Sequence, residues 1–405
     1  MQIKLPLVLD GSTGTQLQKR GFNGETTAEE WSLAHPEAVE DFQRRYIDAG
    51  SNVIYTPTFG ANSAMLESHK VFSRVRELNL GLAAISKRTA GDRAYVAGDI
   101  SPCGRYLYPM GDATFEDLFD IYREQAEALE EAGVDLFVIE TMVSVAEARA
   151  AILAVKSVSA KPVFVTFTCD ENGKTMMGSD VTAALLICQG MGIDAFGLNC
   201  SVGPEAMLKQ LKRLADYAEI PLIAKPNAGL PEIVDGNTVY NCTPEEFTAF
   251  VSEMGKLGVC MFGGCCGTDV EHIEALARKV REITPVMPTE KNRDKLPCAT
   301  GRHPALLPLD VKVRTVIECG DDLEEALEEA AESDDALICI EINSLDDVQC
   351  FADVEYAVDK ALCIKCDDAD LLEKTLRVYQ GRALYEGGLP EKVLLPLVNK
   401  YGLII

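Results

Sequence analysis

The amino-acid sequence predicts an α/β protein: a (β/α)8 (TIM) barrel followed by a second, smaller α/β domain that resembles half a barrel. Eight short apolar runs, each followed by a segment with helical periodicity, occupy the first 270 residues. A proline-rich stretch then interrupts the pattern, and about four further strand–helix units follow it. Eight alternating units favour a closed barrel. A doubly wound open sheet is the alternative, because periodicity alone does not prove that the sheet closes.

The eight predicted strands are rich in Val, Ile, Leu and Phe and lack strict alternation, as expected for strands buried on both faces. They are Leu7–Asp10, Val53–Thr58, Tyr95–Ile100, Asp135–Glu140, Pro162–Thr168, Ala195–Asn199, Pro221–Lys225 and Val259–Phe262. The segments between them have the pattern of amphipathic helices. In Phe115–Ala132, for example, Leu118, Tyr122 and Leu129 share one stripe, and Gly133 follows as a stop signal.

The domain boundaries follow from a change in composition. We assign residues 1–285 to the barrel, 286–308 to a linker and 309–405 to the smaller domain. Pro285–Pro308 contains five prolines and no periodicity, which is typical of a linker. From Ala305 onward the chain has 23 acidic and 9 basic residues, so the smaller domain is strongly acidic.

The net charge of -26 argues against a nucleic-acid partner or an anionic membrane surface, because both are polyanions. No run approaches the roughly 18 apolar residues of a transmembrane helix, and the N-terminus lacks the features of a signal peptide. We therefore expect a cytoplasmic protein that acts on small molecules or on other proteins.

The carboxyl ends of the predicted strands are the place to look for an active site in a barrel. Cys200 follows the sixth strand, and Cys265 and Cys266 follow the eighth, between glycines. Three thiols at one rim can hold Zn²⁺ and leave a fourth position open, which is the arrangement of catalytic zinc. The alternative is that they are buried core cysteines. Most of the other eleven cysteines are expected to fill the core.

Two carboxylates follow apolar strands at the same predicted rim. Asp10 ends the first strand and Glu140 ends the fourth. Either carboxylate could bind an ammonium group of a substrate. The alternatives are a helix N-cap for Asp10 and a solvated rim group for Glu140.

Five strand-end motifs, taken together, resemble the homocysteine S-methyltransferase family. They are Asp10-Gly-Ser-Thr-Gly-Thr, Thr56-Pro-Thr-Phe-Gly-Ala-Asn, Gly197-Leu-Asn-Cys-Ser, Pro226-Asn-Ala-Gly-Leu-Pro and Gly263-Gly-Cys-Cys-Gly-Thr. The similarity covers about residues 1–285 and is greatest to the homocysteine-binding module of cobalamin-dependent methionine synthase.

The resemblance implies a site residue by residue. Cys200, Cys265 and Cys266 would bind zinc, Asp10 and Glu140 would hold the amino group of homocysteine, and backbone amides near Gly11 and Ser12 would receive its carboxylate. We also expect Thr58, Asn199 and Asn227 at the substrate. No side chain is assigned a catalytic role beyond activation of the substrate thiol by zinc.

The implied reaction is the transfer of a methyl group to homocysteine, which gives methionine. Gly60 stands where the betaine-using branch has an aromatic residue, which favours a methylcorrinoid donor such as methylcobalamin. No Asp-x-His-x-x-Gly corrinoid motif occurs in the chain, so the corrinoid is expected on a separate protein. The alternatives are a sulfonium donor of the S-methylmethionine type, another thiol acceptor, or a non-catalytic scaffold.

The smaller domain more faintly resembles part of the folate-binding barrel of methionine synthase, over Ala361–Glu386 and Leu394–Ile405. Lys365 stands where that family has an Asp, and Tyr385-Glu386 where it has Asn-Ser. With about half a barrel present, we expect that pterin binding is lost and that the domain is structural or a docking surface.

Overall fold

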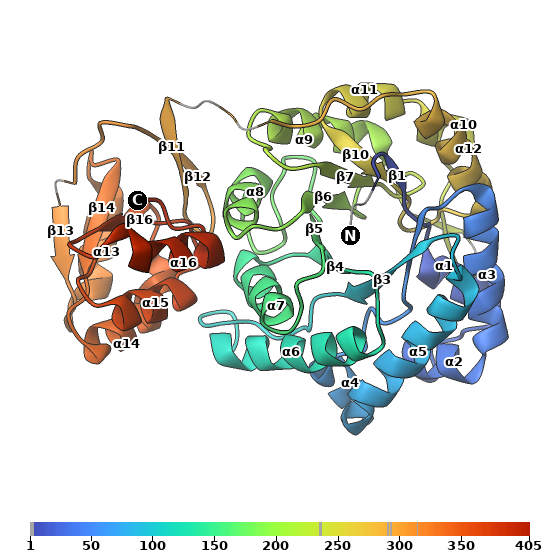
Figure 1. The fold of residues 1–405 in the computed structure, drawn as a ribbon, viewed down its shortest axis with the longest axis horizontal. Helices are drawn as coiled ribbons and strands as arrows, with labels where there is room; N and C mark the ends of the chain where they lie inside the picture. Colours follow the sequence, from blue (N-terminus) through green and yellow to red (C-terminus); the bar gives the residue numbers. More distant parts are fainter. Residues whose placement is uncertain (1–3, 235–236, 290, 292–293, 314) are drawn as a thin grey trace.

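A computed structural model describes residues 4–234, 237–289, 291, 294–313 and 315–405 of the chain. Figure 1 shows a ring of strands enclosed by helices, with a smaller unit, coloured orange to red, beside it. None of the helices in these residues combines the length and apolar character needed to cross a bilayer.

The larger unit is the predicted (β/α)8 barrel. All eight predicted strands form, every neighbouring pair is parallel, and the order around the sheet is β1-β10-β7-β6-β5-β4-β3-β2. The strands are β1 (Leu7–Val8), β2 (Val53–Tyr55), β3 (Tyr95–Ile100), β4 (Leu136–Met142), β5 (Val163–Phe167), β6 (Ala195–Asn199), β7 (Leu222–Lys225) and β10 (Val259–Phe262).

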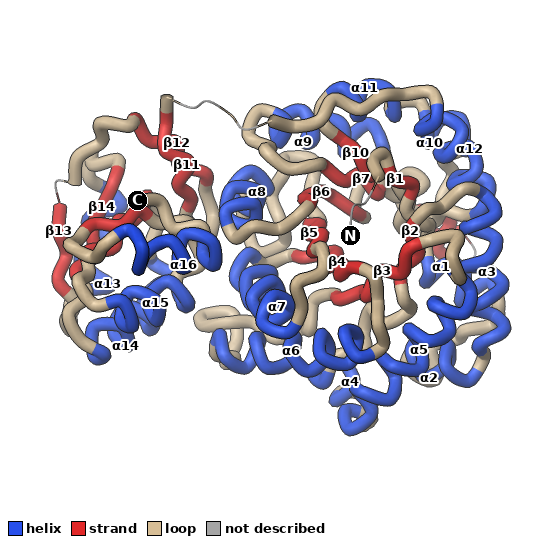
Figure 2. Tube along the Cα trace, in the orientation of Figure 1, coloured by secondary structure: helices blue, strands red, loops and turns tan. Residues whose placement is uncertain are grey.

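The seam between β1 and β2 brings the two ends of this sheet together. The Asn52 amide donates to the Val8 carbonyl at 2.6 Å, and the Val8 amide donates to the Asn52 side chain at 3.0 Å. The ring of strands in Figure 2 therefore corresponds to a nearly closed barrel and not to a doubly wound open sheet.

Helices surround the ring on its outside (Figure 2). The helix predicted over Phe115–Ala132 begins at a capping box in which Thr114 and Asp117 satisfy each other's backbone amides, and its buried face includes Leu118, Tyr122 and Leu129. The helices of this unit are α1 (Thr13–Lys19), α2 (Ala28–Ala34), α3 (Pro36–Ala49), α4 (Ser63–Glu67), α5 (Val75–Ala90), α6 (Phe115–Glu131), α7 (Val145–Val158), α8 (Val181–Gly190), α9 (Pro204–Ala215), α10 (Pro244–Thr248), α11 (Val251–Lys256) and α12 (Val270–Arg281).

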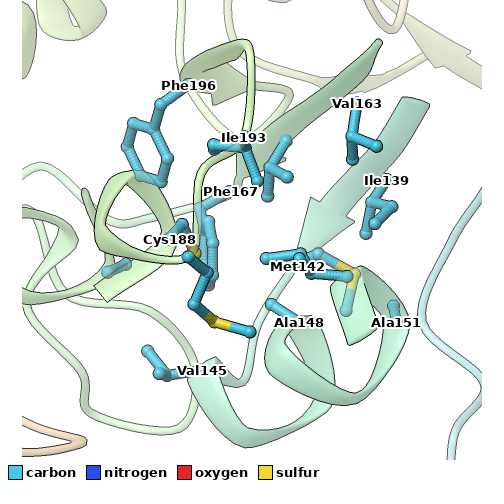
Figure 3. Close-up of a cluster of buried hydrophobic side chains, with 14 of the residues drawn as sticks. Ile139, Met142, Val145, Ala148, Ala151, Val163, Phe167, Cys188, Ile193 and Phe196 are labelled. Atoms are coloured by element: carbon cyan, nitrogen blue, oxygen red, sulfur yellow. The ribbon is translucent and has the colours of Figure 1, made fainter. Parts of the chain in front are cut away.

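The barrel core has two layers. One cluster fills the interior of the ring with inward-facing side chains such as Leu136, Val138 and Phe164. The other lies between the strands and the helices, and Figure 3 shows part of it, where Phe167 and Cys188 pack among aliphatic side chains. Cys188 is thus a core residue, as expected. The filled interior closes the amino-terminal end of the barrel and leaves the opposite end for a site.

The smaller unit has the four predicted strand–helix pairs around one parallel sheet, in the order β13-β14-β15-β16. Its strands are β13 (Thr315–Glu318), β14 (Leu337–Glu341), β15 (Ala361–Lys365) and β16 (Leu384–Glu386). Its helices are α13 (Leu323–Glu332), α14 (Leu345–Val354), α15 (Ala369–Val378) and α16 (Glu391–Tyr401). The division of the chain into domains at 285 and 309 stays a prediction.

The segment predicted as a linker contains regular structure. β11 (Lys295–Ala299) and β12 (Pro304–Pro308) pair antiparallel, and their buried side chains, among them Cys298 and Leu307, pack on the inner face of the second sheet. Pro297, Pro304 and Pro308 lie within this two-stranded hairpin, where edge positions tolerate the missing backbone N–H donor. A second hairpin, β8 (Glu232–Val234) with β9 (Asn237–Val239), follows β7 and was not predicted.

The two units are joined by a polar contact around a buried arginine. Arg149 on α7 is 1% exposed and donates to the carbonyl oxygens of Leu376 (2.6 Å) and Arg377 (3.3 Å) at the end of α15. Burial lowers the pKa of Arg149 to about 10. Arg377 in turn pairs with Glu116 on α6. The second unit is therefore anchored to the side of the barrel, against α6, α7 and α8, the last of which packs against β11, β12 and α16.

Candidate functional site

A cavity of about 450 Å³ opens at the carboxyl ends of the barrel strands. Strand parity explains which side chains reach it, because residues two apart on a strand face the same way. Ala97, Val138 and Ile223 point into the barrel interior. Two positions further along the same strands lie Asp99, Glu140 and Lys225, and all three line the cavity. Other lining residues include Asp10, Gly11, Ser12, Glu29, Tyr55, Thr141, Cys200, Tyr240, Cys265 and Cys266.

Three thiols meet at one side of this cavity, as the sequence predicts. The Sγ atoms of Cys200, Cys265 and Cys266 all lie within 4.8 Å of one another, and those of Cys200 and Cys266 are 3.8 Å apart. Backbone hydrogen bonds to the end of β7 hold them: the Cys200 amide donates to Lys225 at 3.1 Å, and the Cys265 amide to Pro226 at 2.9 Å.

The backbone around these thiols is strained. Thr141, Cys200 and Ser201 have φ of 62°, 59° and 57°, which non-glycine residues seldom adopt. Each such residue costs about 1–3 kcal/mol and persists only where its surroundings impose it. Here Asn199 supplies part of that constraint, because its side chain accepts from the Thr141 amide at 2.9 Å and donates to the Thr141 hydroxyl at 2.7 Å.

The glycines beside the thiols are needed for close packing. A Cβ at Gly264 would lie 2.4 Å from the Thr268 hydroxyl oxygen. At Gly267, where φ is +79°, a Cβ would lie 2.2 Å from the Tyr240 ring. The Tyr240 ring therefore lies against this turn, at the edge of the thiol cluster.

The donor set fits a zinc ion. Two sulfurs bound at about 2.3 Å to one tetrahedral ion lie about 3.8 Å apart, which matches the distance between Cys200 and Cys266. Hydrogen bonds from Cys200 and Cys265 hold the pKa of the Cys266 thiol well below its usual range, so the cluster already favours a thiolate. A site with three protein ligands facing a cavity leaves a position for a substrate atom.

A second cluster of charges lies deeper in the cavity. The Lys225 ammonium is 3.6 Å from Asp10 Oδ1, 3.4 Å from Glu140 Oε2 and 3.5 Å from the centre of the Tyr55 ring. Asp10 also accepts from the Tyr55 amide at 2.8 Å. Burial raises the pKa of Asp10 to about 6, although Lys225 opposes the shift. Burial acts in the same direction on Asp99, and the nearby Glu140 adds to it, so the pKa of Asp99 also rises.

The structure thus brings Asp10 and Glu140 together, but it places an ammonium of the chain itself between them. Four lining residues were not predicted as site residues: Asp99, Lys225, Glu29 and Tyr240. Strand parity is the signal that could have found Lys225, since it lies two residues after the inward-facing Ile223. Glu29 comes from α2, where its carboxylate accepts from the Gly60 amide at 2.7 Å.

Of the other predicted substrate residues, two line the cavity and three lie behind its described lining. Gly11 and Ser12 line the cavity, but the Ser12 amide already donates to the Thr268 hydroxyl at 3.1 Å. Thr58, Asn199 and Asn227 are buried and do not belong to the described lining of the cavity. Thr58 donates to the Asp99 carbonyl at 2.8 Å, so it supports the wall of the cavity from behind.

Fold and site together define a class of protein: a (β/α)8 barrel with a cluster of three thiols at its carboxyl rim, beside a cavity lined by carboxylates. Residues 7–280 match the family model described as homocysteine S-methyltransferase. The chain therefore belongs to the homocysteine S-methyltransferase family.

Curated relatives point to the same family. Methionine synthase from Mycobacterium leprae (strain TN) is 32% identical over 294 residues, which are 68% of this chain and 24% of that protein. Methionine synthase from Mycobacterium tuberculosis (strain ATCC 25618 / H37Rv) is 32% identical over 297 residues, with 68% and 25% covered. The match thus spans about a quarter of the length of these relatives.

Solved structures show the same fold. The oxidized form of the homocysteine methyltransferase MmuM from Escherichia coli superposes with a TM-score of 0.58, covering 67% of this chain and 95% of that chain. The metallated form gives a TM-score of 0.56 and covers 67% and 96%. Both are 22% identical to this chain, so the likeness concerns the barrel fold.

Proposed function

We propose that this chain is a homocysteine S-methyltransferase that holds Zn²⁺ through Cys200, Cys265 and Cys266 and methylates homocysteine to give methionine. The observation that carries the proposal is the cluster of three thiols that faces the cavity, in a chain of this family. A free thiol has a pKa near 8.5 and is mostly protonated at neutral pH. When bound by the three thiolates, zinc supplies the stabilisation of charge that keeps a substrate thiol ionised.

The charged wall of the cavity is proposed to orient the amino acid. Asp10, Asp99 and Glu140 are three carboxyl groups, and Lys225 is one ammonium. The wall therefore favours a second ammonium, that of homocysteine, near Glu140 and Asp10. An ammonium held at this wall would orient the substrate with its thiol free to reach the cysteine cluster, and this positioning lowers the entropic barrier to reaction.

The methyl donor is proposed to be a methylcorrinoid carried by a separate protein. Support comes from exposed apolar side chains in segments that follow barrel strands: Phe59 after β2, which lines the cavity, and Leu230 and Ile233 after β7. Exposed apolar groups around one opening are typical of a surface that another molecule covers.

Residues 1–285 are proposed as the catalytic domain and 309–405 as a docked accessory domain.

The test is a spectral assay of zinc-loaded protein with homocysteine and free methylcobalamin, repeated with S-methylmethionine and product analysis. We expect homocysteine-dependent loss of the methylcobalamin spectrum, formation of methionine, and loss of both in Cys266→Ala. The matched control is Cys242→Ala, a partly buried thiol outside the three-thiol cluster, which should keep activity.

Each result has a distinct meaning. If zinc binds but neither small donor gives methyl transfer, the result favours a protein-bound corrinoid as the donor. Such a corrinoid protein is then added to the assay. Absence of both zinc and activity with every donor would contradict the enzyme and favour a scaffold.

A further inference from the structure

The inner face of the second sheet carries another pair of thiols, remote from the barrel cavity. Cys339 lies in the middle of β14 and Cys363 in the middle of β15, and they are direct partners in the parallel register. They are 0% and 2% exposed. Partnered residues on adjacent strands point to the same side, and both thiols belong to the cluster that packs beneath the hairpin β11–β12.

Glu386 adds a carboxylate to this pair. It ends β16, two residues after Leu384, which is the register partner of Cys363, so its side chain is on the same face. A carboxylate oxygen of Glu386 lies 4.0 Å from the Cys363 sulfur. The sulfurs of Cys339 and Cys363 and a carboxylate oxygen of Glu386 all lie within 4.8 Å of one another. Glu386 is exposed, so the cluster reaches solvent at that edge.

The cluster extends from the core of the second unit to the carboxyl end of its sheet. In open parallel α/β sheets, ligands bind at the carboxyl ends of the strands, and Glu386 lies at that end of its strand. Lys365 is the register partner of Glu386 on the neighbouring strand. It pairs with Glu341 at 3.1 Å, so the charge on Lys365 is already balanced.

We propose that Cys339, Cys363 and Glu386 form a second site for a thiophilic divalent cation, with Zn²⁺ as the reference ion and an open position toward solvent. Two thiolates and one carboxylate are ligand types that zinc prefers. A sulfur and a carboxylate oxygen on one tetrahedral ion lie about 3.5 Å apart, so Glu386 must approach Cys363 slightly, which an exposed side chain can do by rotation. Binding releases the thiol protons to solvent.

The test is to count zinc ions on the full chain by native mass spectrometry, after removal of metal and readdition of zinc chloride under a phosphine reductant. We expect two ions on the unsubstituted protein, one on Cys266→Ala, one on Cys363→Ser, and none on the double variant. Cys366→Ser is the matched control, a buried thiol on the same strand segment but outside the cluster, and it should keep two ions.

Glu386→Gln keeps the test decisive if the buried serine variant does not fold, because this position is exposed. We expect it to weaken the second site at least tenfold while homocysteine methylation is unchanged. Cobalt offers a second readout, since thiolate–cobalt charge-transfer absorption should persist in Cys266→Ala and disappear in the double variant.

Two results would overturn the second site. One is a single zinc on the unsubstituted protein that disappears in Cys266→Ala. The other is a second zinc that persists unweakened in both Cys363→Ser and Glu386→Gln. Because the barrel thiols are tested separately by Cys266→Ala, failure of this proposal is distinguishable from failure of the proposed function.

Discussion

Replacing Lys225 with Met removes the only cation that the described residues place among the carboxyl groups of the barrel cavity, while keeping most of the side-chain volume. In the native protein Lys225 is 3.6 Å from Asp10 and 3.4 Å from Glu140, with 4% of its side chain exposed. Without it, Asp10, Asp99 and Glu140, which are all largely buried, face one another with no cation between them. We therefore predict a large loss of stability that depends on pH.

The magnitude follows from the pKa of Asp10. A rise from 3.8 to about 6 means that ionising this buried group costs the folded state about 3 kcal/mol at neutral pH. Because the folded pKa lies above the unfolded value, this cost appears as pH rises from about 4 to about 6 and is absent at lower pH. Lys225 opposes the rise, so its removal pushes the pKa of Asp10 and Asp99 higher still. Breaking a buried ion pair by removing one partner typically costs about 3–5 kcal/mol.

Urea unfolding followed by fluorescence of the single tryptophan, Trp31 on α2, measures this loss in the barrel. For Lys225→Met we expect the free energy of unfolding to fall by about 3–5 kcal/mol at pH 7.5, and by less than half as much at pH 5, where Asp10 and Asp99 take up protons. Lys212→Met is the control, since Lys212 pairs with Glu253 on the surface and should cost below about 1 kcal/mol at both pH values. A loss below about 1 kcal/mol for Lys225→Met, or an equal loss at both pH values, would refute the reasoning.

Three further predictions concern the thiol cluster, the substrate and the contact between the units. Gly264→Ala places a methyl group 2.4 Å from the Thr268 hydroxyl, so the neighbouring Cys265 must shift. Zinc affinity, measured by competition with a chelator, should therefore fall about tenfold or more. Gly14→Ala is the control, because Gly14 has open space around it and the substitution should not change zinc affinity. Glu140→Gln removes one carboxylate of the proposed ammonium site and should raise the KM for homocysteine about tenfold with kcat changed less than about threefold. A loss confined to kcat would contradict the proposed role. Arg149→Met removes both hydrogen bonds to the end of α15 and should destabilise the second unit by about 2–4 kcal/mol. The measurement is limited proteolysis, in which cleavage after residue 286 should become faster. Cleavage at the native rate would contradict this role of Arg149.

The strands of both sheets could be predicted from the sequence because parallel strands buried on both faces need nearly continuous apolar runs. The runs at Ala195–Asn199 and Val259–Phe262 correspond residue for residue to β6 and β10. Closure could not be predicted in the same way. It depends on the contact of Asn52 with Val8, which are far apart in sequence and carry no pattern that pairs them.

The thiol cluster could be predicted because its members follow recognisable strands and lie among glycines. Strand parity places Lys225 at the same rim but does not show what surrounds it. A lysine after an apolar run is usually a solvated strand end, and the carboxylates that neutralise Lys225 come from β3, β4 and the segment after β1. The hairpin β11–β12 was missed for a related reason. Its strands contain prolines, and its stability comes from packing on a sheet that forms later in the chain.

The filled interior of the barrel has a kinetic consequence. Since side chains such as Leu136, Val138 and Phe164 close the ring below the cavity, a molecule that rests deep among the carboxylates enters and leaves through the same mouth as a molecule seated over the thiols. In the proposed reaction the amino acid would then have to bind before a donor that covers the mouth, and its product could leave only after that donor. Because the cavity has one entrance for both molecules, we expect the initial-rate patterns of an ordered sequential mechanism. Excess donor should inhibit the reaction, because it would block that entrance.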